Sequence, residues 1–153
     1  MNMTTQIDIS ERRGQSYQLI DELMTLRTEM LAQYSMLGSA RPFEKDDETI
    51  TAIQDFCQAL VDYTADAHFS LYRFISEGKE RRAQVLDVAN RVYPKISETT
   101  GIIIAFNDKY DDQKHCEESL GMLEKDLSYI GEVLADRIEN EDSLIRVLRS
   151  ERK

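Results

Sequence analysis

The sequence contains few of the residues that end helices or build tight turns. Six glycines and two prolines occur in 153 residues, and there is no tryptophan. Because β-sheet proteins need many turns, this scarcity, together with 31% charged residues, favours an all-α fold. The length matches one domain with its own core, so we expect a single helical-bundle domain over residues 1–153.

Long apolar runs are also missing. A membrane-spanning helix needs about 20 predominantly apolar residues, and no such stretch occurs. Residues 1–13 are polar and acidic where a signal peptide would have an apolar segment. These two absences predict a cytoplasmic protein that does not bind membranes.

Motifs for catalysis and metal binding are scarce as well. The chain has two cysteines, Cys57 and Cys116, without C-x-x-C spacing, so we expect reduced thiols. It contains neither a G-x-S-x-G elbow nor a glycine-rich phosphate loop. The nearest metal-ligand pattern is Asp112-x-x-His115, and a single such match is expected by chance among 29 acidic residues. We therefore predict a non-enzymatic protein without metal or cofactor.

Positive charge is in short supply. The formal net charge is −10, from 19 Lys and Arg against 29 Asp and Glu. A surface of this sign repels phosphate backbones, which argues against direct nucleic-acid binding. The same field attracts a basic partner, for example a protein that itself binds DNA.

The spacing of apolar residues is typical of long amphipathic helices. Four helices are expected, at about residues 11–37, 48–76, 79–110 and 117–149. Ser10 is the expected N-cap of the first, and residues 1–10 and 150–153 are expected to be tails. Pro94 should kink or split the third helix. Short connections favour antiparallel neighbours, so the prediction is an up-and-down four-helix bundle.

Residues 38–47 form the clearest linker. Gly38 should end the first helix and Pro42 cannot continue it. Asp46 or Asp47 is positioned to cap the second helix.

Two ionisable residues interrupt the apolar stripes. His68 lies on the flank of the second helix's core face, and Glu141 lies on the apolar stripe of the fourth helix. A buried carboxylate needs a partner, and Arg137 is one turn away on the same face. The pattern predicts a polar network of His68, Arg137 and Glu141, either structural or in contact with a partner.

One stretch resembles a known family. DFCQALVDYTADAHFSLY, residues 55–72, is similar to the central motif D-F-C-Q-x-L-V-D-Y-x-x-x-x-H-F-S-x-Y of the Rsd/AlgQ family. The likeness continues in IGEVLADRIENEDSLI, residues 130–145, and covers nearly the whole chain. It implies a helical bundle that binds the primary sigma factor of bacterial RNA polymerase at region 4. That region recognises the −35 promoter element, so the resemblance implies an anti-sigma factor that blocks promoter and core-polymerase contacts.

The resemblance suggests which residues contact the partner. Phe69 lies on a helix face among aspartates, which is typical of an apolar anchor surrounded by charge. The competing interpretation packs Phe69 under the 38–47 linker or the third helix. The expected contacts are Asp62, Asp66, Phe69 and Tyr72, with Leu23 and Arg27 on the first helix.

Leu23 is also a departure from the family. Relatives carry tryptophan at this position, and a smaller anchor there predicts a different affinity. The apolar surface of the first helix is broader than one bundle contact requires, which leaves a homodimer open.

A second function remains open at this point. Histidine phosphotransfer domains are four-helix bundles with one exposed histidine, and Ala67-His68 resembles the start of their motif. The motif continues with a basic residue and a glycine where this chain has Leu71 and Tyr72.

Overall fold

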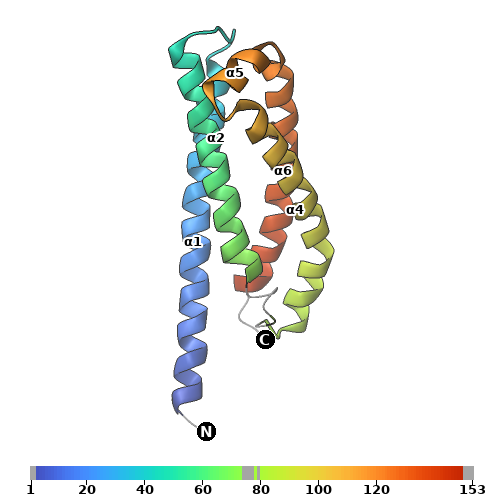
Figure 1. Cartoon of the computed structure of the whole chain (residues 1–153). Helices are drawn as coiled ribbons and strands as arrows, with labels where there is room; N and C mark the ends of the chain where they lie inside the picture. Colours follow the sequence, from blue (N-terminus) through green and yellow to red (C-terminus); the bar gives the residue numbers. More distant parts are fainter. Residues whose placement is uncertain (1–2, 74–77, 79, 150–153) are drawn as a thin grey trace.

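The computed structural model describes residues 3–73, 78 and 80–149, with side chains described from residue 18 onward. Every regular element in these ranges is helical, and the long helices form an up-and-down bundle (Figure 1). The four long helices are α1 (Met3–Ser39), α2 (Asp47–Ala67), α4 (Ala83–Tyr110) and α6 (Leu123–Arg149). The short elements are η1 (His68–Tyr72), a π-helical turn; α5 (Gln113–Ser119); and η2 (Leu120–Met122), a 3₁₀ turn. The prediction of an all-α four-helix bundle is confirmed.

Several predicted boundaries are wrong. The first helix begins at Met3, so Ser10 lies inside it and most of the predicted N-terminal tail is helical. The third helix continues through Pro94, which is exposed, so the helix is not split there. The predicted fourth helix is two helices, α5 and α6, separated by the turn η2. The predicted ends at residues 74–76 and 150–153 lie outside the described residues.

The linker prediction is accurate at its second end. Asp46 is the N-cap of α2, and its carboxylate accepts a hydrogen bond from the Thr49 amide at 2.8 Å. This bond lowers the pKa of Asp46. Gly38 still belongs to α1, which ends one residue later at Ser39. Beyond η1, Gly78 has φ +73°, a left-handed conformation that favours glycine and turns the chain toward α4.

The core lies between two helix pairs, α1 with α2 and α4 with α6. Phe56 of α2 packs between Tyr34 of α1 and Phe106 of α4, with both ring centroids 5.7 Å away. The hydroxyl of Tyr34 also donates a hydrogen bond to the Leu127 carbonyl at 2.9 Å. Gly131 permits this approach, because a β-carbon there would overlap the Tyr34 hydroxyl. The aromatic layer therefore ties α1, α2, α4 and α6 together.

No helix within the described ranges is apolar enough over a sufficient length to cross a membrane.

Candidate protein-binding face

The outer side of the α1/α2 pair carries two parallel stripes of side chains. The helices are antiparallel, and the Ser70 hydroxyl donates to the Leu19 carbonyl at 3.2 Å, which fixes their register. Residues on each outer stripe recur at alternating spacings of three and four, which keeps them in line along a helix. We call this surface the acidic seam; it consists of Leu19, Glu22, Leu26, Glu29, Gln33 and Met36 on α1, and Glu48, Ala52, Asp55, Ala59, Asp62, Asp66 and Phe69 on α2 and η1. All thirteen side chains are exposed or half-buried.

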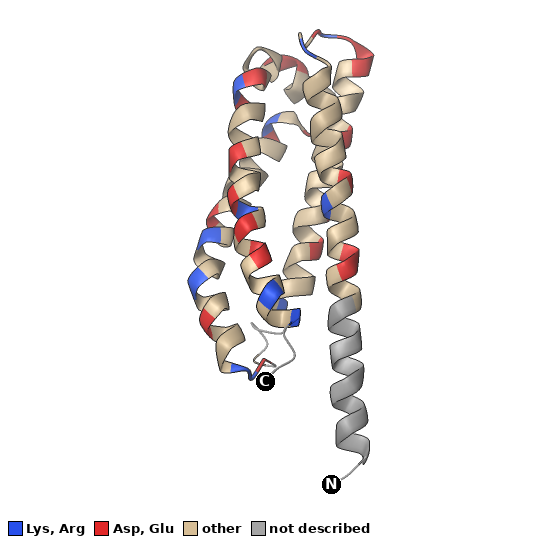
Figure 2. Cartoon of the chain, turned by 180° about the vertical axis from the view of Figure 1, so that it is seen from behind, with Lys and Arg blue, Asp and Glu red and all other residues tan. Residues whose placement is uncertain are grey.

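The acidic seam carries charge of one sign. Helix α2 has no Lys or Arg, and Arg27 is the only cation of α1 between residues 18 and 39. The Arg27 side chain is buried, so it adds no positive charge to the surface. Viewed from behind, α4 and α6 show both signs (Figure 2). Over the described side chains, the surface of the α1/α2 pair therefore carries charge of one sign, whereas that of α4 and α6 is mixed.

Phe69 lies at one end of the acidic seam. Its ring is 54% exposed, although it is one of the largest apolar side chains in the protein. Asp62 is exposed and accepts a hydrogen bond from Gln58, while the half-buried Asp66 accepts one from Ser70 at 3.1 Å. The interpretation that Phe69 is covered by the 38–47 linker or by the third helix is wrong, because the side chain is exposed and the linker lies at the opposite end of α2.

Three expected contact residues are not on the surface. Leu23 is completely buried in the core, Arg27 is buried among carboxylates, and Tyr72 is 3% exposed with its ring edge against Tyr93. A regular α-helix would place Tyr72 on the same face as Phe69. The π-helical turn η1 rotates the chain less per residue than an α-helix does, and this turns Tyr72 into the core. In this structure these three side chains offer a partner no surface.

Arg27 belongs to a buried ion-pair network centred on Glu141, which is completely buried. One Glu141 oxygen accepts hydrogen bonds from Arg27 Nη2 at 3.0 Å and from the Tyr63 hydroxyl. The other accepts one from Arg137 Nε at 2.9 Å, as the sequence predicted. Burial, reinforced by the Glu141 carboxylate, raises the pKa of Tyr63. The network joins α1, α2 and α6.

Two further contacts complete the network. Arg27 Nη1 donates to Asp142 at 2.7 Å, and Arg137 Nη1 donates to the hydroxyls of Thr99 and Thr100 on α4. The network thus connects all four long helices. The sequence predicted Arg137 and Glu141 as partners but contained no signal for Arg27, which is 114 residues away from Glu141.

His68 is not part of this network. The prediction that it flanks the core is wrong, because its side chain is exposed. Cys57, on the same side of α2, is buried, and burial close to Cys116 of α5 raises its pKa to about 12. His68 lies eleven residues further along, about 16 Å from Cys57 at 1.5 Å per residue, and beyond the cover that α5 provides.

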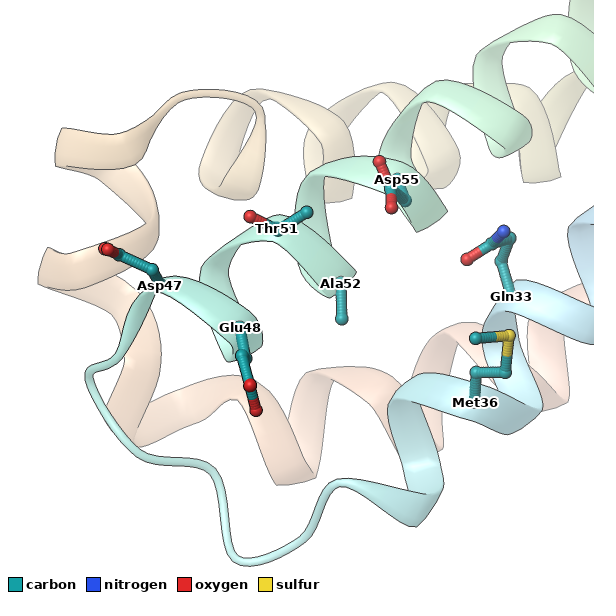
Figure 3. Close-up of a pocket in the computed structure, with 7 residues that line it drawn as sticks. All are labelled: Gln33, Met36, Asp47, Glu48, Thr51, Ala52 and Asp55. Carbon is teal, nitrogen blue, oxygen red and sulfur yellow. The ribbon is translucent and has the colours of Figure 1, made fainter.

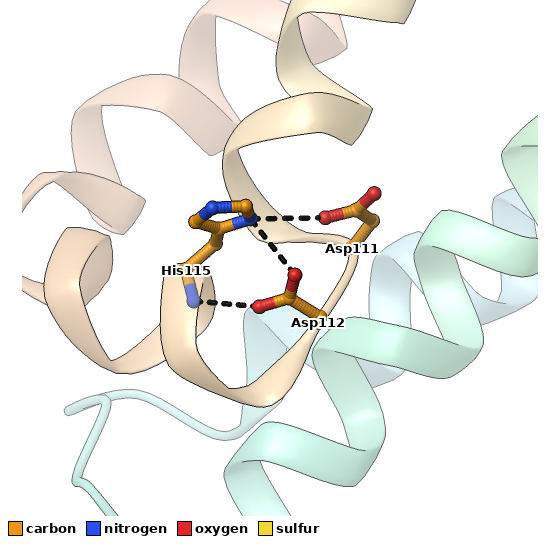
Figure 4. A group of neighbouring side chains, drawn as sticks. All are labelled: Asp111, Asp112 and His115. Atoms are coloured by element: carbon orange, nitrogen blue, oxygen red, sulfur yellow. Dashed lines mark hydrogen bonds and ion pairs between the residues drawn. The ribbon is translucent and has the colours of Figure 1, made fainter.

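A small polar cluster lies at the start of α5 (Figure 4). His115 Nδ1 is 3.0 Å from Asp112 and 3.4 Å from Asp111, and Asp112 also caps α5 through the His115 amide. One ligand atom from each residue lies within 4.8 Å of the others, so this cluster is where a cation would find three ligands. All three side chains are exposed, and the helix cap already accounts for their arrangement.

At the other end of the acidic seam is a groove of about 360 Å³ between α1 and α2 (Figure 3). We call it the loop-end groove; it is lined by Gln33, Met36, Asp47, Glu48, Thr51, Ala52 and Asp55. The contact residues predicted from the sequence include none of these seven. A signal was present in the three-and-four spacing from Glu48 to Phe69, which marks one continuous stripe.

Comparison with known proteins agrees with the resemblance noted in the sequence. The family described as "Regulator of RNA polymerase sigma(70) subunit, Rsd/AlgQ" matches residues 2–149. A protein named "Regulator of sigma D" from Yersinia enterocolitica is 31% identical over 141 residues, which cover 90% of this chain and 84% of the relative. Its namesake from Salmonella arizonae is 31% identical over 143 residues, 92% of this chain and 88% of the relative. No solved structure matches the chain significantly.

Proposed function

This chain belongs to the Rsd/AlgQ family of regulators of the RNA polymerase sigma(70) subunit, and we propose that it is an anti-sigma factor that binds region 4 of the primary sigma factor. In this proposal the bound chain blocks the contacts of region 4 with the promoter and with core polymerase. It acts in the cytoplasm and by binding alone, without catalysis or a cofactor. The observation that carries the proposal is the acidic seam with Phe69 exposed at its end.

The charge of the acidic seam supports a DNA-binding partner. A protein surface that contacts the DNA backbone needs Lys and Arg to neutralise phosphates. The seam offers carboxylates such as Asp55 and Asp62 without a surface cation between them. Opposite charges of this kind speed the encounter and orient the partner, and salt screens them.

Phe69 supplies the apolar part of the proposed contact. More than half of its ring is exposed in the free chain, so a partner can remove substantial apolar area from water. Aromatic anchors that become desolvated in an interface typically cost about 2 kcal/mol or more when truncated. We therefore expect Phe69→Ala to weaken binding of region 4 by about 2 kcal/mol, roughly 30-fold.

The test compares the affinity of purified region 4 for the wild-type chain, Phe69→Ala and Asp62→Asn by isothermal titration calorimetry at several salt concentrations. Tyr129→Ala is the matched control, because Tyr129 is an aromatic residue of equal exposure, 54%, on α6. We expect a large loss for Phe69→Ala, and for Asp62→Asn a loss that shrinks as salt rises. Failure of the wild-type chain to bind region 4 would reject the proposed function. Equal effects of Phe69→Ala and Tyr129→Ala would reject the proposed site.

Phosphotransfer through His68 is the second candidate, and the exposure of this side chain favours it. A phosphoryl donor can reach an exposed imidazole more readily than one that leans toward the core, which is the position expected from the sequence. Incubation with phosphorylated receiver domains should label the chain if this function is real, and His68→Gln should abolish the label. Under the anti-sigma proposal, neither the wild-type chain nor the His68→Gln variant becomes labelled.

A further inference from the structure

The acidic seam is longer than a contact at Phe69 requires. Phe69 and Ala52 are 17 residues apart, which corresponds to about 25 Å along a helix axis. At the far end, Met36 is 63% exposed, more than any other large apolar side chain among the described residues. The seam therefore has two exposed apolar ends, Phe69 and Met36, with carboxylates between them.

The loop-end groove has an apolar interior and an anionic rim. Gln33 and Met36 extend from α1, and the methyl group of Ala52 points into the space between the helices (Figure 3). Alanine at this position leaves the groove open, and a methionine wall adapts to the shape of an inserted side chain. The carboxylates on the rim come from the first turns of α2 and from Asp55.

The apolar interior and the anionic rim determine which class of ligand fits the loop-end groove. An anionic ligand would be repelled by the rim, and an apolar interior offers few hydrogen bonds to a small polar ligand. A cationic amphipathic helix satisfies both parts, because its apolar side chains enter the groove while Lys and Arg meet the carboxylates. The three-and-four spacing of the acidic seam also matches a helix laid along it, since such a stripe stays straight beside a packed partner helix.

We infer that the loop-end groove is a second anchor point, which receives an apolar side chain from a cationic helix of the same partner that contacts Phe69. The inference rests on the proposed function, and it assigns a role to Met36 and Ala52 in addition to the Phe69 end of the acidic seam. The partner then bridges both ends of the α1/α2 pair.

The experiment measures binding of purified region 4 to Met36→Ala and Ala52→Arg. The control is Ala105→Arg, which makes the same change at an exposed alanine of α4; Ala52 is half-buried, so its result is compared only if the variant keeps its fold. We expect a loss of at least about fivefold for Met36→Ala and more for Ala52→Arg, against less than about twofold for Ala105→Arg. Thermal unfolding of each variant confirms that the fold is retained. A photo-crosslinking residue in place of Thr51, on the groove wall, should attach to a Lys- and Arg-rich helix of region 4.

The outcomes separate the two proposals. If the wild-type chain binds region 4 and Phe69→Ala weakens it, but both groove variants behave like Ala105→Arg, the second anchor is wrong and the proposed function stands. If the wild-type chain does not bind region 4, both proposals fail. If the groove variants change only self-association, measured by analytical ultracentrifugation, the occupant is a second copy and the inference is overturned.

Discussion

Replacing Glu141 with glutamine tests how much of the stability depends on the buried network. The substitution removes a charge that faces Arg27 at 3.0 Å and Arg137 at 2.9 Å, while the volume of the side chain is nearly unchanged. Removing one partner of a buried ion pair typically costs about 3–5 kcal/mol, because the remaining charge stays buried. Here Arg27 keeps Asp142, and Arg137 keeps two threonine hydroxyls. We therefore expect the low end, about 3 kcal/mol.

Urea unfolding followed by far-UV circular dichroism measures this change. With a slope of about 2 kcal/mol per molar urea, the transition midpoint should fall by about 1.5 M. The thermal midpoint should fall by roughly 6–12 °C for a chain of this length. Glu139→Gln is the control, because Glu139 is an exposed carboxylate on the same helix, and its effect should stay within about 0.5 kcal/mol.

A result in which both variants unfold at the same urea concentration would refute the assigned role of Glu141. A double-mutant cycle sharpens the test. Arg137→Met combined with Glu141→Leu should be less destabilising than the sum of the two single changes, by about 1 kcal/mol or more, because it leaves no unpaired partner from this pair. Strict additivity would mean that the two side chains do not interact.

Two further predictions concern the core. Gly131→Ala should destabilise the fold by about 1–2 kcal/mol in urea unfolding, since the new methyl group overlaps the Tyr34 hydroxyl. Adding Tyr34→Phe to this variant should recover part of the lost stability. If no stability is recovered, the overlap with Tyr34 is not the cause of the loss. Burial raises the pKa of Cys57 to about 12 and that of Cys116 to about 11 from an ordinary 9.0, so the folded chain should react slowly with a disulfide reagent at pH 8 and the urea-unfolded chain quickly. Rapid labelling of the folded chain would contradict the burial of the two thiols. Because folding favours the protonated thiols, these groups contribute to the free energy of unfolding below pH 9, and this contribution declines as the pH rises toward 11–12.

Features that depend on neighbouring residues were the most predictable from the sequence. The N-cap at Asp46 and the pairing of Arg137 with Glu141 are both set within four residues, so spacing and side-chain chemistry were enough. The start of the first helix was predicted wrongly for the converse reason. Ser10 is a good cap, but nothing local requires a helix to begin at a residue that can cap it.

Features that depend on contacts between distant segments could not be predicted from the sequence. A helical-wheel projection of the sequence assumes a regular α-helix with about 100° per residue. The π-helical turn η1 breaks this assumption at Tyr72, which turns into the core. Leu23 fits a core position and a contact position equally well on such a wheel. The exposure of His68 depends on which segments pack against the end of α2, and the sequence did not separate one such segment, α5, from the fourth helix.

The inward turn of Arg27 affects how genetic data on this protein should be interpreted. A variant that loses the Glu141 carboxylate leaves the buried Arg27 guanidinium with Asp142 as its remaining carboxylate partner, which weakens the contact between α1 and α6. A screen for lost association would then select substitutions at Glu141, although this residue is completely buried. Measuring protein abundance alongside association would distinguish such hits from true contact residues.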